Sequence, residues 1–273
     1  MIIGNKIFHK KRVYNSIEWA KSQISTAPDG AVFLADVHEY TRGRQDRIWV
    51  RYPGQLLVTV LLKPKILNQI AQQDLELRLN QLNMAVCLGI LEPLKSYGIV
   101  LKWPNDFVFA CDPKPPPPTK PLQRPDRRRI ISKKVGGMIF DLVWQADSLL
   151  GIIIGFALNV NSIISESDKI YKIATSIKTI LNKEIDEKEL LKNLLASLDK
   201  FYQKWLNFEF DQIYDLWKKE QFYLGKNIKV HKKDETLVQG IFQDVLPNGD
   251  LILEEQGGRK GKISFYVVEN LYV

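Results

Sequence analysis

Residues 99–106, which read Ile-Val-Leu-Lys-Trp-Pro-Asn-Asp, constrain the fold of this 273-residue chain more than any other stretch. The run starts with apolar, β-forming residues. A proline and two Asx residues end it, because proline cannot donate to the hydrogen-bond ladder of a sheet. The pattern predicts a buried strand that surfaces at a turn, where polar groups often meet ligands. An ordinary strand end with an Asx-turn would carry the same pattern. The polar or aromatic side chains gathered there are Lys102, Trp103, Asn105 and Asp106.

The bulk composition is that of an ordinary globular protein, with 45% hydrophobic and 26% charged residues. The length allows one large domain and a small one. Two cysteines, Cys87 and Cys111, give neither a disulfide framework nor metal-ligand spacing. No apolar run approaches the roughly 18 residues of a membrane span, and the first residues lack the layout of a signal peptide. We therefore expect no membrane association and a reducing, cytoplasmic compartment, or a plastid stroma, which would look the same.

The formal net charge of +8 is concentrated in one segment. Residues 112–134 contain eight Lys and Arg and two Asp, which leaves only +2 for the rest of the chain. Residues 113–129 are rich in proline and arginine and have no apolar periodicity, so we predict a disordered or polyproline insert in a hairpin. Such a segment could contact the phosphates of a nucleic acid, although a solvated basic loop explains it more simply.

Hydrophobic periodicity predicts the remaining elements. Helices are expected at residues 16–25, 74–97, 175–181, 187–205 and 210–222. Strands are expected at residues 31–37, 56–62, 134–141, 149–154, 227–230, 236–245, 251–254 and 262–268. The last four are short and broken by turns, which is typical of a small SH3-like β-barrel. The change from long helical patterns to short strand patterns near residues 221–226 predicts a first domain of 1–223 and a second of 224–273.

Two further segments have the composition of binding elements. Residues 38–49 form a polar loop between strands, with three arginines around a glycine; arginine suits bidentate capture of a phosphate or carboxylate. The strand at 134–141 contains Gly136 and Gly137, and a small-residue segment at 155–161 follows the next strand. Glycine permits close approach of a ligand, so these strands could floor a narrow pocket for a flat ligand. A hairpin with a bulge would also fit.

Together these segments resemble the biotin protein ligases, over nearly the whole chain and in the order found in that family. Residues 101–106 match the Lys-Trp-Pro-Asn-Asp segment of the family, and residues 134–139 match its Lys-x-Gly-Gly-Ile-Leu strand. Residues 41–49 and 155–161 resemble its Gly-Arg-Gly-Arg-x-Gly-Arg-x-Trp loop and its Gly-x-Gly-x-Asn strand end. The resemblance implies an α+β fold like that of class II aminoacyl-tRNA synthetases, with helices on a mixed central sheet. It also implies the short class without an N-terminal DNA-binding domain.

The resemblance further implies that ATP and Mg²⁺ activate biotin as biotinyl-5′-AMP. The acyl group then passes to a lysine of a biotin carboxyl carrier protein, a subunit of acetyl-CoA carboxylase. Lys134, Arg42 and Lys102 would be the catalytic residues, and a homodimer is compatible with the family. Asp106 would serve a metal ion. The implied biotin contacts are Asn15, Ser16, His38, Arg42, Gly43, Arg44, Lys134, Gly136 and Gly137. The implied ATP contacts are Arg44, Trp49, Lys102, Asn105, Asp106 and Asn159.

Several positions depart from the family pattern. The Ser-Thr-Asn triplet of the first helix reads Asn15-Ser16-Ile17 here, and a family glutamine falls on His38. Three family glycines are replaced, by Thr41, Asp46 and Ala157. These departures leave other functions open: a ligase for lipoate or another acyl group, a paralogue that binds without catalysing, or a nucleic-acid binder that uses the basic insert.

Overall fold

The computed structural model describes residues 1–43, 47–111, 131–264 and 267–272. The predicted insert at 113–129 lies outside these residues. The helices are α1 (Ser16–Ser22), α2 (Gln72–Leu94), α3 (Ile177–Leu181), α4 (Glu187–Leu206) and α5 (Phe210–Lys219), with 3₁₀ turns η2 (Lys65–Gln69) and η3 (Lys95–Tyr97). The first seven strands are β1 (Ile7–Val13), β2 (Ala31–His38), β3 (Gln55–Leu62), β4 (Ile99–Lys102), β5 (Asp106–Cys111), β6 (Ile131–Gln145) and β7 (Ser148–Asn159). The others are β8 (Asn227–Lys232), β9 (Leu237–Val245), β10 (Leu251–Glu254), β11 (Lys260–Ile263) and β12 (Val268–Tyr272).

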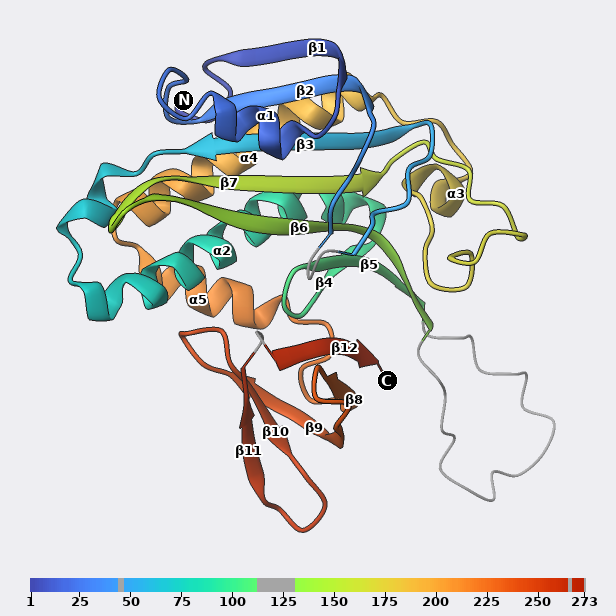
Figure 1. Ribbon diagram of the computed structural model, residues 1–273. Coiled ribbons are helices and arrows are strands. Elements are labelled where there is room, and N and C mark those ends of the chain that lie inside the picture. The colour runs from blue at the N-terminus through green and yellow to red at the C-terminus, as the bar shows by residue number, and fades with distance from the viewer. Residues whose placement is uncertain (44–46, 112–130, 265–266, 273) are drawn as a thin grey trace.

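The large sheet has seven strands in the order β1-β2-β3-β7-β6-β5-β4. β1 runs parallel to β2, and each of the other neighbouring pairs is antiparallel. The long helices α2 and α4 cover one face and α1 covers the other (Figure 1). Adjacent residues of one strand therefore enter different hydrophobic clusters: Val60 packs with the long helices, and Leu61 packs with Ile17 of α1. The predicted mixed sheet with helices packed on it is confirmed.

The apolar stripes of α2 and α4 hold these two helices together. Leu190, Leu194 and Leu198 of α4 are buried, and the Asp186 side chain accepts hydrogen bonds from the first turn, as an N-cap does. A Cβ atom on Gly89 of α2 would lie 2.9 Å from the Leu198 Cα. Only glycine lets the two helices approach this closely, so the residue at position 89 sets how near α2 and α4 can lie to each other.

The second sheet has five antiparallel strands in the order β11-β10-β9-β8-β12 and curls below the first sheet, where the C-terminus lies (Figure 1). The strand predicted at 262–268 is wrong: β11 ends at Ile263, β12 begins at Val268, and the two form opposite edges of the sheet. Trp103, which is 1% exposed, joins the two sheets because its indole donates a 3.0 Å hydrogen bond to the Gly249 carbonyl.

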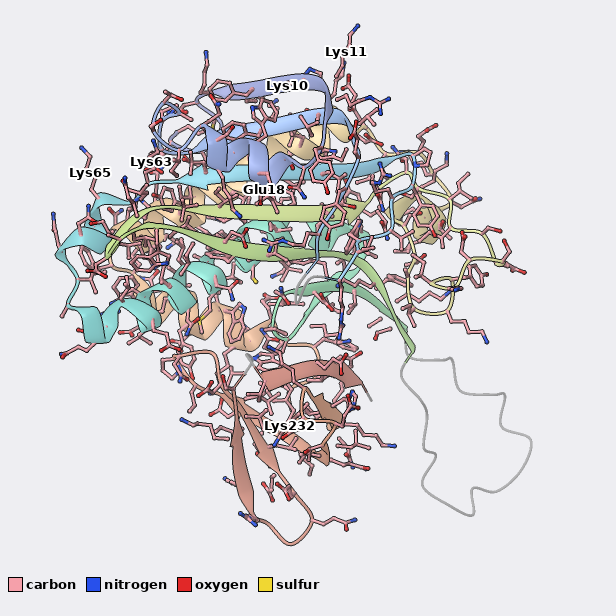
Figure 2. All side chains as sticks on the ribbon, in the orientation of Figure 1. Lys10, Lys11, Glu18, Lys63, Lys65 and Lys232 are labelled. Carbon is pink, nitrogen blue, oxygen red and sulfur yellow. The ribbon has the colours of Figure 1, made fainter. Side chains whose placement is uncertain are left out.

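Two elements differ from the sequence prediction for identifiable reasons. β1 was not predicted because its residues are mostly polar; the Lys11 side chain projects outward from this edge strand (Figure 2), and the Lys10 ammonium lies 4.5 Å from the centre of the Trp19 ring. β6 and β7 are longer than predicted: Gly136 and Gly137 lie in the predicted strand but further from its start, and Gly155 lies inside β7 and not after it. Glycine weakens a strand locally, but the long pairing of β6 with β7 carries the ladder through these positions. Within the described part of the chain, no helix has the length and hydrophobicity to cross a membrane.

Candidate ligand-binding site

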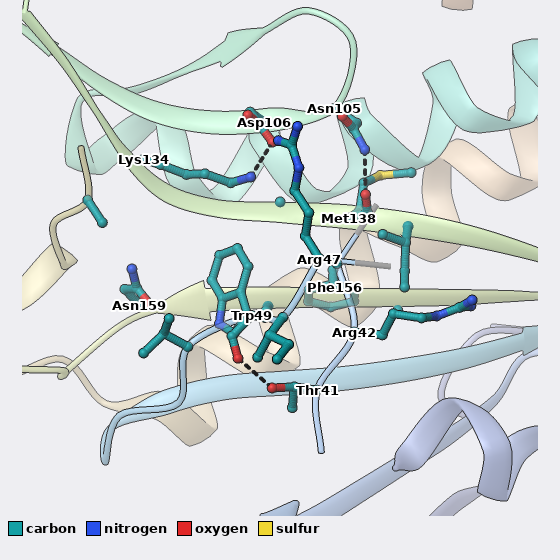
Figure 3. A pocket seen from close by; sticks show the side chains of 18 of the residues that line it. Thr41, Arg42, Arg47, Trp49, Asn105, Asp106, Lys134, Met138, Phe156 and Asn159 are labelled. Atoms are coloured by element: carbon teal, nitrogen blue, oxygen red, sulfur yellow. Dashed lines mark hydrogen bonds and ion pairs between the residues drawn. The ribbon is translucent and has the colours of Figure 1, made fainter. Parts of the chain in front are cut away.

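A cavity of about 890 Å³ opens over the ends of β3, β7 and β6. The β4–β5 turn forms one wall, the N-terminus of α1 forms another, and residues of 38–43 and 47–50 line the space between them (Figure 3). The C-terminal sheet completes it through Val268, Glu269 and Leu271 of β12. Segments far apart in the sequence therefore share one space.

Two lysines and an aspartate define one end of the cavity. The Lys134 ammonium of β6 lies 2.6 Å from the Asp106 carboxylate at the start of β5. Asp106 pairs with Gly137 across the sheet. A Cβ on Gly137 would lie 3.1 Å from Asp106 Oδ1 and 3.2 Å from Lys134 Nζ. Glycine at 137 therefore makes room for the ion pair. The Trp49 ring packs over the Lys134 ammonium at 5.4 Å, a cation–π distance.

Lys102 is the unusual cation of this end. It lines the cavity opposite Asp106 in the β4–β5 hairpin. Among the described residues, its ammonium has no hydrogen bond or ion pair. Burial lowers the pKa of Lys102, Asp106 opposes the shift, and Lys134 adds to it. A partly buried ammonium without a direct counter-ion is costly, and an anionic ligand in the cavity would supply the missing charge.

The other end of the cavity, beside α1, is largely apolar. Ile17 lies against Gly155, where a Cβ would come within 2.9 Å of the Ile17 side chain. The Ser16 and Thr59 hydroxyls share a 2.7 Å hydrogen bond. The Asn15 amide is already used: its oxygen accepts from the Ile17 N–H at 2.8 Å, and its nitrogen donates to the Tyr40 carbonyl. Asn15 therefore shapes this end by capping α1.

His38 adds a polar atom to the apolar end. It is 4% exposed and lines the cavity. Its Nε2 is buried and has no hydrogen-bond partner among the described residues. Burial, and secondarily the Arg51 guanidinium, lower the pKa of His38, so the imidazole is neutral near pH 7. The Trp49 indole N–H is also buried without a partner. Both atoms are free to bond a ligand.

The two described arginines of the loop at 41–49 each form an ion pair with a carboxylate. Arg42 bonds Asp141 of β6, which also accepts Lys21 at 3.0 Å, and Figure 3 shows the Arg42 side chain extending away from Lys134. The Arg47 guanidinium lies 2.8 Å from Glu269 of β12. The loop is closed by a 2.7 Å bond from the Thr41 hydroxyl to the Trp49 carbonyl.

The structure brings most of the residues predicted for the site to this one cavity. Asn159 lines it, but its amide is occupied by Gln55 and by the Thr175 carbonyl. Gly136 does not line it and faces Leu158 of β7. Arg44 lies outside the described residues. The predicted residues that line the cavity are Asn15, Ser16, His38, Arg42, Gly43, Trp49, Lys102, Asn105, Asp106, Lys134, Gly137 and Asn159.

Sequence reasoning missed several lining residues with polar side chains, among them Arg47, Thr59, Ser132, Lys172, Tyr223 and Glu269. Arg47 belongs to the loop already singled out, and its charge was the available signal. Thr59 belongs to β3, Tyr223 to the segment between α5 and β8, and Glu269 to β12. No local pattern marks these three, because only the tertiary fold brings them to the cavity.

The fold and the cavity define a protein with the biotin protein ligase fold. The biotin protein ligase of Aquifex aeolicus in complex with biotin and ATP superposes with a TM-score of 0.74 at 22% identity, covering 98% of both chains. A biotin protein ligase-like protein of unknown function from Silicibacter sp. has a TM-score of 0.63 at 11% identity, covering 94% of this chain and 93% of that one.

The curated relatives are named as ligases. The bifunctional ligase/repressor BirA of Bacillus spizizenii and that of Bacillus subtilis are each 24% identical over 241 residues, which is 86% of this chain. The match spans 65% of their length. No family model matches the chain. The resemblance predicted from the sequence is thus confirmed in the fold and in these relatives.

Proposed function

We propose that this chain uses ATP to join biotin to a lysine of a biotin carboxyl carrier protein through biotinyl-5′-AMP. The observation that carries the proposal is the cavity itself, which holds two lysines at one end and, at the other, a recess beside α1 where Ile17 and Gly155 lie near the Ser16 and Thr59 hydroxyls. The named activities of the relatives support it. Residues 1–223 would be the catalytic domain and residues 224–273 the C-terminal domain.

The cationic end suits the first half-reaction. The biotin carboxylate attacks the α-phosphorus of ATP, a carboxylate–phosphate bond forms, and pyrophosphate leaves. Two anions must meet, so cations have to neutralise them and hold them in line. Lys134 and Lys102 would do this, with Lys134 exchanging Asp106 for a ligand oxygen. Arg42 would join them after leaving Asp141. Residues 41–49 would order further as ligand binds.

The second half-reaction requires no covalent intermediate with the enzyme. The neutral amine of the carrier lysine attacks the acyl carbon, an amide forms, and AMP leaves with the bonding electrons. The amine proton passes to solvent. The protein would hold the anhydride and exclude water, which otherwise hydrolyses it.

A magnesium ion fits the carboxylate at the cationic end. Mg²⁺ usually takes one or two carboxylates and several substrate or water oxygens. Asp106 lines the cavity and is the acid nearest the two lysines in the hairpin. Asp106 would hold the ion together with phosphate oxygens, and the ion would supply further neutralisation of the triphosphate.

The recess beside α1 would take the ring of biotin. Ser16 and Thr59 can redirect their shared hydrogen bond to a ligand, and His38 offers a free nitrogen. Trp49 and Asn105 would lie on the nucleotide side with Asn159. The apolar contact of Ile17 with Gly155 favours a second candidate, a ligase for lipoate or another acyl chain, because such chains need no polar partner there.

The test is incubation with ATP, Mg²⁺, labelled biotin and a carrier domain, which should label one lysine. Lys134→Ala should abolish adenylation and leave the circular dichroism spectrum unchanged. Lys200→Ala is the matched control, because Lys200 pairs with Glu92 on the helical face and does not line the cavity. Parallel reactions with lipoate and octanoate separate the two ligases. No labelled product at any enzyme concentration, together with a biotin-induced rise in melting temperature, would leave a binding protein instead.

A further inference from the structure

We propose that Glu269 is a positioning residue: it holds Arg47 against the cavity and so makes the C-terminal sheet a working part of the site. The identity of the ligand rests on the function proposed above, but the contact does not. Arg47 Nη2 lies 2.8 Å from Glu269 Oε1, and both residues line the cavity. The contact joins residues 222 positions apart.

Arg47 needs such a partner because the hydrogen bonds between residues 41–43 and 47–49 hold its backbone and not its side chain. The Gly43 N–H bonds the Arg47 carbonyl at 2.6 Å, which fixes the backbone and leaves the long side chain free to rotate. Holding an arginine side chain in one rotamer costs up to about 2 kcal/mol. Figure 3 shows the Arg47 side chain extending across the cavity from the loop. Because the ion pair with Glu269 already holds the Arg47 side chain in one rotamer, that loss of entropy does not weaken the binding of a ligand.

Glu269 is itself held from behind. Its second oxygen lies 3.2 Å from His231 Nδ1 of β8, and the Glu269 side chain is 32% exposed. The other imidazole nitrogen of His231 faces Glu235, also at 3.2 Å. His231 of β8 therefore holds the Glu269 carboxylate of β12 in position beside Arg47. Such double support fixes a side chain better than one contact does.

Glu235 provides a matched control within the same cluster. It contacts the same histidine as Glu269, but it is 83% exposed and lies outside the cavity lining. A change of charge at Glu235 alters the cluster without touching Arg47. Glu269→Gln and Glu235→Gln therefore differ in one respect that matters, which is the bond to Arg47.

The first measurement needs no activity. Limited trypsin digestion without ligand is followed by mass spectrometry of the fragment that begins at Ile48, which reports cleavage after Arg47. Glu269→Gln should speed this cleavage about fivefold, Glu269→Asp should restore part of the protection, and Glu235→Gln should match the unmodified chain. Unchanged cleavage in Glu269→Gln, or equal acceleration in Glu235→Gln, overturns the proposal.

The second measurement is ATP–pyrophosphate exchange. Glu269→Gln should raise the KM for ATP about five- to tenfold, the cost of ordering one long side chain on binding, and keep kcat within about twofold, because saturating phosphates order Arg47 themselves. A loss of kcat at unchanged KM contradicts the positioning role. Faster cleavage in Glu269→Gln with no exchange in any chain, the unmodified one included, would support the positioning contact and reject the proposed function.

Discussion

Replacing Lys102 by methionine should stabilise the protein and weaken its binding of nucleotide. The two side chains have similar length, so the change removes the charge and keeps most of the packing. Burial lowers the pKa of Lys102, which means that the folded chain pays to keep this ammonium charged. Removing it should raise the free energy of unfolding by about 1 kcal/mol, in line with other replacements of buried charges by apolar groups.

The loss of binding should be the larger effect. A hydrogen bond to a charged group contributes about 1.5–3 kcal/mol, which corresponds to about a tenfold to 150-fold rise in the Kd for ATP, since 1.4 kcal/mol is a factor of ten. Urea unfolding measures the stability, and isothermal titration calorimetry measures the affinity.

Lys134→Met is the control, because it should change the free energy of unfolding in the opposite direction. Its ammonium is paired with Asp106 at 2.6 Å and is half-buried, so its removal takes one favourable cation away from the Asp106 carboxylate. Stability should fall by up to about 1 kcal/mol, and the affinity should fall as well. The reasoning is refuted if Lys102→Met unfolds at lower urea than the unmodified chain, or if it binds ATP with unchanged affinity.

Three further predictions concern other parts of the site. Because burial lowers the pKa of His38 below 6.5, the unfolded chain binds a proton there that the folded chain does not, so stability should fall as the pH drops through 6.5; His38→Gln should flatten this decline in urea titrations between about pH 5.5 and 7.5. Gly137→Ala forces the ion pair of Lys134 and Asp106 to shift by a few tenths of an ångström and should slow pyrophosphate exchange about tenfold; an unaltered rate would show that this pair has no part in adenylation. Trp103→Phe leaves a buried carbonyl without its donor and should cost about 1–3 kcal/mol of stability; a midpoint of urea unfolding equal to that of the unmodified chain would count against it.

The sequence was sufficient to predict the elements that local periodicity determines. The apolar stripe predicted at 74–97 is α2 with the 3₁₀ turn that follows it, and the stripe at 187–205 is α4. The Pro-Asn-Asp turn correctly placed Lys102 and Asp106 together, because a tight hairpin leaves them paired across its two strands.

The remaining features depend on long-range pairing and could not be predicted. β1 is an exposed, basic edge strand whose only regular partner is the parallel β2, so its own residues carry no strand pattern. The cavity takes Thr59, Tyr223 and Glu269 from three elements with nothing in common. Arg42 was expected over the ligand, yet in the structure it bonds Asp141, and no motif could show which carboxylate it would find.

The placement of β12 has a consequence for biosynthesis. The wall that Val268, Glu269 and Leu271 provide belongs to β12, the last strand described, whereas the wall at the start of α1 includes Asn15. A chain is made from its N-terminus and its early segments fold first. On the ribosome the cavity therefore remains open on one flank until this strand has been made, and a nascent chain cannot enclose a ligand there before its translation reaches that point.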